Sequence, residues 1–413
     1  MAGVHGAMMT RYGLPLVLAG AVACGGPPPP APPSPARDTI AVQPAPPPRP
    51  PAPPAPLPPP PPPRPHAVRL AFVGDINLGT TTLPDGVPPD TGRGLLDRSR
   101  PYLVGDLVVG NFEGVLADTG TSAKCRRLRA DEDPRRAGRP RRRPVADTAT
   151  VRPGCYAFLT PTVLAPRLVD AGFTHLNLAN NHANDYGPAG RQSTERILDS
   201  LGLGRYGPLG QVALDTIRRA DSVITVGLLG FATYPHAYNL LDIARSAAVV
   251  DSVRALVDLL VVTFHGGSEG IRALHVPETA ESLGREPRGD LRRWARAVID
   301  AGADAIVGHG PHVLRGIEFY RGRPIVYSLG NFVTYRGFNV EGALGVTGVL
   351  QLEFAPDRRL RSAHLMPMVQ RSREGPAPDP SHRALDLVRR LSREDFGTDA
   401  AQVTADGAIL PPP

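Results

Sequence analysis

Cysteine, tryptophan and long apolar runs are all scarce in this chain. Its 413 residues include three cysteines and one tryptophan. A chain of this length can bury a substantial core by itself, so a small scaffold held together by disulfides is excluded. After the first 25 residues, no apolar run is long enough for a membrane-spanning helix. Glycine follows no Gly-X-Y period, which excludes a collagen, and a coiled coil is excluded as well.

The net positive charge is confined to one segment. The formal charge of the chain is +7, and residues 124–143 alone carry ten basic and three acidic residues. The rest of the chain is therefore neutral overall and indicates no charged partner. The segment has no aromatic residue on which bases could stack, so nucleic acid is not expected as a partner. A solvated loop is favoured, and binding to an anionic surface or an acidic polymer stays open.

The first 24 residues have the pattern of a bacterial export signal. Arg11 supplies a positive charge, residues 14–22 form an apolar core, and small residues precede Cys24. The sequence before Cys24 resembles a lipobox, in which the cysteine is lipidated, although Ala21 stands where leucine is usual. We therefore expect an exported lipoprotein, anchored to a membrane of the cell envelope. The alternative is an ordinary cleaved signal with an incidental cysteine.

Proline is concentrated directly after this signal. Residues 27–65 contain 23 of the 49 prolines. Such segments adopt extended polyproline II structure and act as spacers. Residues 25–66 are therefore predicted to form a disordered tether between the membrane and a folded domain.

The two remaining cysteines, Cys125 and Cys155, flank an Arg-rich insert at residues 119–155. Disulfides persist in exported proteins, so these two cysteines are predicted to pair and to close the insert into a loop. The alternative, two free thiols in a cytosolic protein, requires the export signal to be false.

Short apolar runs alternate with helical patterns from residue 68 onward. Strands are predicted at residues 68–73, 107–109, 175–178, 223–229, 259–264, 305–307, 325–329, 349–354 and 362–368. Helices are predicted at residues 161–171, 189–201, 291–301 and 383–393, with Gly172 and Gly302 as left-handed caps. This alternation predicts an α/β protein with strands buried beneath helices. Residues 372–413 are expected to hold a C-terminal helix and a loose tail.

Six of the predicted strands end directly at Asp, Asn, Glu or His. The residues at these ends are Asp75, Asn111 with Glu113, Asn180 to His182, His265 to Glu269, His309 to His312, and Asn331. Open α/β sheets place their sites at the carboxyl ends of strands, so we expect these side chains to gather in one site.

Carboxylate, imidazole and amide oxygen together suit Mn²⁺, Fe or Zn²⁺ better than a thiolate-seeking metal. Two such ions, bridged by a carboxylate, can clamp a phosphate, and a nearby histidine can protonate the leaving oxygen. For any single histidine, a hydrogen-bonded core residue is the alternative. For the whole set, a polar site is favoured.

These motifs resemble the CapA capsule-synthesis family of the metallophosphatase-like superfamily. The matching strings are Gly74-Asp75, Gly110-Asn111-Phe112-Glu113, Ala179-Asn180-Asn181-His182 with Asp185-Tyr186-Gly187, Thr263-Phe264-His265-Gly266-Gly267-Ser268-Glu269, Gly308-His309-Gly310-Pro311-His312 and Tyr327-Ser328-Leu329-Gly330-Asn331-Phe332. The resemblance implies an α/β fold, a four-layer α/β/β/α sandwich of the metallo-dependent phosphatase type. It places a CapA-like domain at residues 67–371, interrupted by the Arg-rich insert.

The resemblance also implies roles for individual residues and one or two divalent metal ions. Asp75 would bind one metal and Glu113 would bridge the pair. Asn181, His265 and His309 would bind the second metal, and His312 the first. His182 would be the general acid, oriented by Asp185. Asn111, Asn180, Glu269 and Asn331 would contact substrate or support the ligands.

The chain departs from the superfamily pattern at several of these positions. Asn77 replaces the histidine of the first motif, which implies a poorer metal site. Glu113 replaces the bridging aspartate, and the final histidine pair has two residues between its members rather than one. Gly266 and Gly270 stand where CapA-like proteins commonly have Trp and Tyr, so one pocket wall is expected to be more open.

Members of the family are associated with making or exporting anionic capsule polymers, typically poly-γ-glutamate, alongside membrane-bound ligases. Three functions remain open at this point. The first is metal-dependent hydrolysis of a phosphoester or a related bond. The second is non-catalytic binding of an acidic polymer, and the third is a degenerate site whose polar groups satisfy one another.

Overall fold

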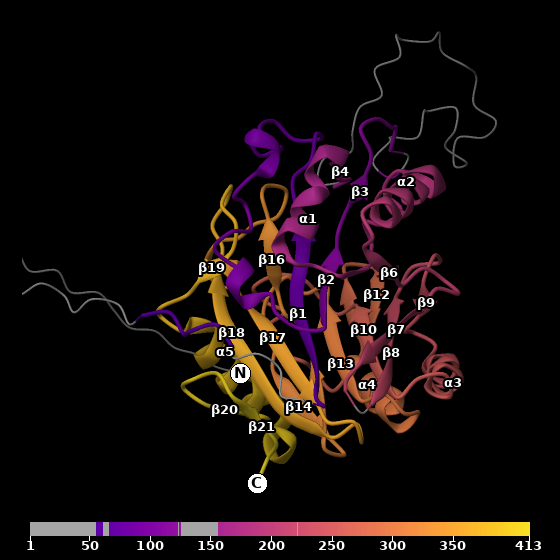
Figure 1. The fold of residues 1–413 in the computed structure, drawn as a ribbon, viewed down its shortest axis with the longest axis vertical. Coiled ribbons are helices and arrows are strands. Elements are labelled where there is room, and N and C mark those ends of the chain that lie inside the picture. The colour runs from indigo at the N-terminus through magenta and orange to yellow at the C-terminus, as the bar shows by residue number, and fades with distance from the viewer. Residues whose placement is uncertain (1–54, 61–65, 123, 125–155, 221) are drawn as a thin grey trace, which may run out of the picture. The chain divides into compact units, whose positions relative to one another are not determined.

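The computed structural model describes residues 55–60, 66–122, 124, 156–220 and 222–413 (Figure 1). The predicted signal with Cys24, most of the tether, and Cys125 and Cys155 lie outside the described residues. The described residues all belong to one compact unit. No helix of the described part of the chain combines the length and apolar character needed to cross a membrane.

The first of two large sheets has eight strands. Their order is β19-β18-β17-β1-β2-β5-β6, and β16 pairs with β1. The bounds are β1 (Val68–Asn77), β2 (Leu107–Phe112), β5 (His175–Asn177), β6 (Gly204–Tyr206), β16 (Asn331–Thr334), β17 (Val346–Phe354), β18 (Leu360–Val369) and β19 (Ala377–Pro378). Neighbouring strands from β1 to β6 are parallel, whereas β17 to β19 run antiparallel to their neighbours.

The second sheet has seven strands in the order β14-β15-β13-β10-β8-β7, with β9 paired to β8. The bounds are β7 (Ala213–Arg218), β8 (Val223–Ala232), β9 (Tyr238–Asn239), β10 (Leu259–His265), β13 (Ala305–His309), β14 (Ile317–Tyr320) and β15 (Arg323–Val326). Its central strands β8, β10, β13 and β15 are parallel.

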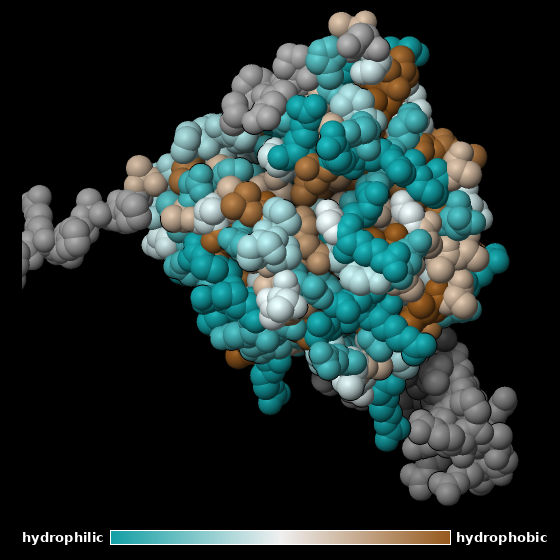
Figure 2. All heavy atoms as spheres, turned by 90° about the horizontal axis from the view of Figure 1, so that it is seen from below, coloured by the Kyte–Doolittle hydropathy of each residue, from teal (hydrophilic) through white to brown (hydrophobic). Residues whose placement is uncertain are grey.

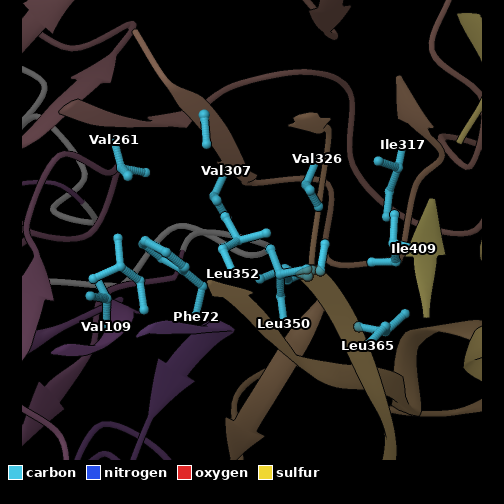
Figure 3. Packing of buried hydrophobic residues seen from close by; sticks show 14 of the residues in the cluster. Phe72, Val109, Val261, Val307, Ile317, Val326, Leu350, Leu352, Leu365 and Ile409 are labelled. Atoms are coloured by element: carbon cyan, nitrogen blue, oxygen red, sulfur yellow. The ribbon is translucent and has the colours of Figure 1, made fainter. Parts of the chain in front are cut away.

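The two sheets pack face to face around a shared apolar core. Phe72 and Leu352 of the first sheet and Val261 and Val307 of the second belong to the same buried cluster. Figure 3 shows side chains of both sheets pointing into this shared space. Because alternate side chains of a strand point to opposite faces, each sheet also presents a second apolar face that must be covered.

Helices cover the outer face of each sheet. Leu168 of α1 (Pro166–Ala171) and Leu198 of α2 (Gly187–Ser200) join the cluster beside the first sheet. Helices α3 (Ile243–Arg254) and α4 (Leu291–Asp300) pack on the second sheet, where Trp294 is fully buried. The four-layer α/β/β/α sandwich expected from the sequence is therefore confirmed.

The remaining elements are short or lie at the borders of the sandwich. Helix α5 (Arg383–Phe396) contributes Leu385 and Val388 to the core between the sheets. Three small sheets pair β3 (Val115–Leu116) with β4 (Leu159–Thr160), β11 (Glu281–Leu283) with β12 (Glu286–Gly289), and β20 (Gln402–Val403) with β21 (Ile409–Leu410). Single 3₁₀ turns occur at Asp90–Gly92, Arg100–Tyr102, Thr162–Leu164, Gly342–Gly345 and Gly397–Asp399.

One predicted helix is divided in the structure. The helix predicted at residues 161–171 is split into a 3₁₀ turn and α1, which begins at Pro166. A proline is favourable at this first position because its N–H would have no helical partner. Gly172 and Gly302 have φ angles of 98° and 114°, so the predicted left-handed conformations are confirmed.

The strand predicted at residues 325–329 ends at Val326, because the chain then crosses from the second sheet to the first. Residues 327–330 make this crossing, and Asn331 begins β16 instead of following a strand end. The crossing segment lies directly on Gly74: a Cβ atom there would approach the carbonyl oxygen of Gly330 to 1.9 Å. Glycine at position 74 is therefore required by close backbone approach.

The surface is predominantly hydrophilic on the face drawn in Figure 2, where apolar side chains are scattered among charged ones. Scattered apolar residues of this kind are normal for a folded domain.

Candidate metal centre

Four parallel strands bring the candidate ligands to the same edge of the sandwich. In the first sheet, Asp75 near the end of β1 is paired in register with Asn111 of β2. In the second sheet, His265 ends β10 directly beside His309, which ends β13. The structure therefore places Asp75 beside Asn111 in one sheet and His265 beside His309 in the other.

The acidic and imidazole groups converge in the buried interior of this edge. Ligand atoms of Asp75, Glu113 and His265 all lie within 4.8 Å of one another. His265 Nδ1 is 3.1 Å from Glu113 Oε1, and His312 Nδ1 is 2.9 Å from Asp75 Oδ2. His309 Nδ1 lies 3.6 Å from Asp75 Oδ1. Their exposed fractions run from 0% to 8%, so all five side chains face one another away from bulk solvent.

Asn111 holds the two carboxylates in place. Its Nδ2 donates to Asp75 Oδ1 and to Glu113 Oε1, each at 2.9 Å. Its Oδ1 accepts from the amides of Asn177 at 3.0 Å and Asn180 at 3.1 Å. Because every polar atom of Asn111 is engaged, the residue supports the candidate ligands and is not free to act as one.

The unsatisfied atoms of this cluster fit a divalent cation. Glu113 Oε2, His265 Nε2 and His309 Nδ1 are buried and have no hydrogen-bond partner among the described residues, and the same holds for Asn181 Oδ1, whose residue lines the adjoining pocket. Leaving buried acceptors unpaired costs free energy, and proteins rarely accept this at several neighbouring atoms. Carboxylate oxygen, imidazole nitrogen and amide oxygen are the ligand types of Mn²⁺, Fe and Zn²⁺ sites. The donor set therefore matches a metal centre.

The two buried carboxyl groups have opposite pKa shifts. Burial alone would raise the pKa of Asp75, but its interactions with the neighbouring imidazoles of His309 and His312 outweigh burial and lower it. Burial raises the pKa of Glu113, and the negative charge of Asp75 raises it further. Burial lowers the pKa of His265, and the positive charge of Arg288 adds to this shift. Such opposed shifts are typical of functional sites, where like charges are held together.

Near the candidate metal centre, His182 is held by a carboxylate. His182 Nδ1 lies 2.7 Å from Asp185 Oδ2, which also accepts from the backbone N–H of Phe158 at 2.8 Å. Lys124 Nζ contacts the other oxygen of Asp185 at 2.5 Å. Burial lowers the pKa of His182 to about 4, against the opposing effect of Asp185. The imidazole is therefore oriented by its Nδ1 partner, which fixes the direction of Nε2.

Two further predicted residues have supporting positions. The Oδ1 atom of Asn180 accepts from the backbone N–H groups of His182 and Ala183, each at 3.0 Å, and thus shapes the turn that carries His182. The Nδ2 atom of Asn331 donates to the carbonyl oxygen of His312 at 3.2 Å. Both side chains hold the backbone of other site residues.

The departures at Asn77 and Gly266 have different structural outcomes. Asn77 donates to the Glu113 carbonyl oxygen at 2.8 Å and accepts from Gly79 N–H at 3.1 Å, so its side chain supports the backbone. Gly266 was expected to open a pocket wall. Instead, a Cβ atom at this position would lie 2.9 Å from the carbonyl oxygen of Arg288, so the space is already filled by strand β12.

A pocket of about 830 Å³ adjoins the candidate metal centre, since His312 belongs to its lining. Its lining includes Asn181, His182, Glu269 and His312, together with residues that the sequence patterns did not single out: Lys124, Tyr156, Phe158, Asn184, Tyr234, Pro235, His236, Leu283, Glu286, Arg288, Gly337, Phe338 and Asn339. The Phe158 ring lies 4.4 Å from that of His182, and the Phe338 ring 4.7 Å from that of His312, measured between centroids. The pocket thus combines a polar floor with aromatic walls.

His236 in this pocket predicts a measurable pH dependence of stability. Its Nε2 lies 3.0 Å from the carbonyl oxygen of Asn180, and burial, followed by the charge of Arg191, lowers its pKa from 6.5 to about 4. Between pH 6.5 and 4 the unfolded chain binds a proton that the folded chain does not, so stability falls as the pH falls. We expect His236→Gln to remove about 1–2 kcal/mol of the stability loss between pH 7 and 5.

Urea unfolding with a chelator present, at both pH values, would measure this difference. The matched control is His275→Gln, because His275 is exposed. An unchanged pH dependence in His236→Gln would contradict the prediction.

Comparison with known proteins supports the resemblance to capsule synthesis proteins. Residues 143–336 match the family model described as bacterial capsule synthesis protein PGA_cap. Over this part of its length the chain is similar to the CapA family. The matched residues include Asn181, His182, His265, His309 and His312, whereas Asp75 and Glu113 precede them.

Two curated relatives extend this result. The PGA biosynthesis protein CapA of Bacillus subtilis is 36% identical over 188 residues, which cover 41% of this chain and 45% of that protein. The capsule biosynthesis protein CapA of Bacillus anthracis is 33% identical over 41% of this chain and 42% of its own length. The alignments therefore span less than half of these relatives. Among solved structures, a 5'-nucleotidase precursor of Thermus thermophilus matches 79% of this chain and 59% of its own, with 14% identity and a TM-score of 0.36.

Proposed function

We propose that this chain acts in the synthesis or export of an anionic capsule polymer of the poly-γ-glutamate type, through a metal-dependent phosphoesterase-like site. The polymer is inferred from the two CapA relatives, which are named for PGA and capsule biosynthesis. The hydrolytic site is inferred from the buried cluster of Asp75, Glu113 and His265, whose unpaired atoms fit a cation.

In this proposal, Asp75, Glu113, Asn181, His265, His309 and His312 hold one or two divalent ions, with Mn²⁺, Fe and Zn²⁺ as the candidates. A divalent ion bound there supplies Lewis-acid chemistry, which polarises a phosphoryl oxygen and makes water more acidic. The protein contributes the fixed positions of the ligands, because Asn111 and the strand register hold them before any substrate arrives.

His182 is proposed to supply the proton to the leaving oxygen. Asp185 accepts from Nδ1, which leaves Nε2 to exchange a proton with a bound substrate. The Phe158 and Phe338 rings pack beside His182 and give this side of the pocket an apolar surface. General acid catalysis of this type contributes about 10²- to 10⁴-fold to a rate.

Metal content and turnover of the purified full-length protein test this proposal together. We expect about one or two equivalents of a divalent metal, and Mn²⁺-dependent turnover of an artificial phosphodiester that a chelator abolishes. Elemental analysis measures the first and release of the chromogenic alcohol the second. Absence of metal, or absence of turnover with Mn²⁺, Fe²⁺ and Zn²⁺ in turn, would contradict the hydrolytic role.

Asn77 supports a second candidate, a non-catalytic factor that binds acidic polymer in the same pocket. Its side chain is committed to the backbone of Glu113 and Gly79, so the first metal position has one candidate ligand fewer than the superfamily pattern provides. A binding factor would retain polymer through charge, and its affinity would fall steeply as salt is added.

We also propose that the chain is exported and tethered to a membrane through lipidated Cys24, with Cys125 and Cys155 paired in a disulfide. The lipobox-like sequence and the flanking positions of the two cysteines support this. The intact mass of the mature protein, before and after reduction, checks both modifications. An unlipidated N-terminus or two free thiols would contradict them.

A further inference from the structure

The β11–β12 hairpin brings an arginine to the wall of the pocket. Arg315 fixes the hairpin by donating to both oxygens of Glu281, at 2.9 Å and 2.7 Å, and to the carbonyl oxygen of Ala273 at 2.7 Å. The N–H of Gly267 donates to the carbonyl oxygen of Arg288 at 2.9 Å. Arg288 is therefore locked directly against the loop that follows His265.

The guanidinium of Arg288 is buried among acidic and phenolic partners. Its exposed fraction is 0%, and its Nη1 donates to the Tyr234 hydroxyl at 2.7 Å. Its Nη2 forms an ion pair with Glu269 Oε1, while Nε lies 3.7 Å from Glu286 Oε1. Nη2 therefore has a carboxylate partner, whereas Nε has no hydrogen-bond partner among the described residues.

Glu269 links this arginine to the metal centre. One of its oxygens pairs with Arg288, and the other lies 4.0 Å from His312 Nε2. Glu269, Glu286, Arg288 and His312 all line the same pocket. The Glu269 side chain is 22% exposed, so an incoming group can reach it from the pocket.

We propose that Arg288 forms a carboxylate-binding subsite beside the metal centre, and that Glu269 occupies this subsite until a carboxylate of the substrate replaces it. This inference rests on the proposed function, since a γ-linked glutamate polymer carries a free carboxylate on every residue. It names the group by which such a polymer would be held next to the candidate ligands.

The physical reason lies in the cost of a buried charge. An unpaired arginine in this position would be strongly unfavourable, and Glu269 relieves that cost in the absence of ligand. Exchanging one carboxylate for another keeps the arginine paired throughout, and guanidinium groups match carboxylates in a planar, two-bond geometry. The exchange therefore needs only a short movement of Glu269 toward solvent.

The test measures binding of a γ-linked glutamate oligomer to the full-length, chelator-treated protein by calorimetry. We expect Arg288→Gln to weaken binding about tenfold, and Glu269→Gln to tighten it about tenfold, because the internal competitor loses its charge. When Glu269→Gln is added to Arg288→Gln, the affinity for the oligomer should not rise, because Glu269 competes with the oligomer only for Arg288. Inorganic phosphate and an α-linked glutamate oligomer, as separate probes, show whether the subsite selects the polymer or accepts any anion.

The controls are Arg285→Gln on the same hairpin and Glu278→Gln in the loop before it, because both side chains are exposed. Arg288→Lys keeps the positive charge and serves as the conservative variant. The unfolding midpoints of all variants show whether a change in binding comes from a change in folding. Weaker binding in Glu269→Gln, equal binding in Arg288→Gln and Arg285→Gln, or no binding by the unmodified protein would overturn the subsite. If the protein hydrolyses no phosphodiester but its binding of the oligomer still depends on Arg288, the result would count against the catalytic role alone.

Discussion

Replacing Asp75 with asparagine is expected to abolish hydrolysis and to reduce the bound metal. Asp75 lies within reach of Glu113, His309 and His312 and is the group that these two histidines keep negatively charged. Asparagine keeps the shape of the side chain but removes the charge that would attract a cation. We expect turnover of an artificial phosphodiester to fall by a factor on the order of 10³. Elemental analysis after dialysis against Mn²⁺ would show the accompanying loss of metal.

The control for Asp75→Asn is Asp85→Asn, which changes an exposed carboxylate on the loop after β1. Unfolding midpoints measured in chelator would show whether either variant is misfolded. Full metal content in a folded Asp75→Asn protein would exclude Asp75 as a ligand and would remove the main support for the hydrolytic site.

The strand ends could be predicted from the sequence because a parallel sheet imposes its own geometry. Residues that follow buried apolar runs must emerge at the same edge, so Asp75, Asn111, His265 and His309 gather without any knowledge of distant contacts. The first and last residues of the strands were predicted less accurately than the edge at which their polar ends lie. Strand β1 continues to Asn77, because its last residues pair with β16 on one side and β2 on the other.

Asn331 could not be placed correctly because its position depends on a change of sheet. Apolar patterns show that a strand is buried, but they do not show to which sheet the next residues belong. The chain crosses at residues 327–330, and the side chain of Asn331 then supports the backbone of His312.

Helix α3 (Ile243–Arg254) was missed for a different reason. Its composition is rich in alanine and valine, and its apolar face is weakly separated from its polar face. The available signal was Asp242, whose side chain accepts from the backbone N–H of Arg245 as an N-cap.

Arg288 illustrates what residue patterns cannot give. Nothing in the segment Glu286–Gly289 has the period of a buried strand, and its position depends on Arg315 and Glu281, which anchor the hairpin. The close approach of Arg288 to Gly266 also explains a departure from the family motif. Gly266, which predicted an open pocket wall, is instead the residue against which the β11–β12 hairpin packs.

Replacing His182 with alanine is expected to affect turnover and polymer binding differently, which separates the two candidate functions. If His182 supplies a proton, its removal should lower turnover of the phosphodiester by about 10²- to 10⁴-fold. Binding of a γ-linked glutamate oligomer should persist, because the charged groups of the pocket, Lys124 and Arg288 among them, remain. Turnover and calorimetric affinity, measured on one preparation at two salt concentrations, separate the two effects.

His275→Ala is the matched control for His182→Ala, because it removes an exposed imidazole that is likewise paired with an aspartate. A large loss of turnover in His182→Ala, with unchanged affinity and metal content, supports proton donation by His182. Turnover equal to that of the control would exclude this role for His182. Salt-sensitive polymer binding without turnover in any preparation would favour the binding factor, since Asp185 and Phe158 would then hold His182 only as part of the pocket wall.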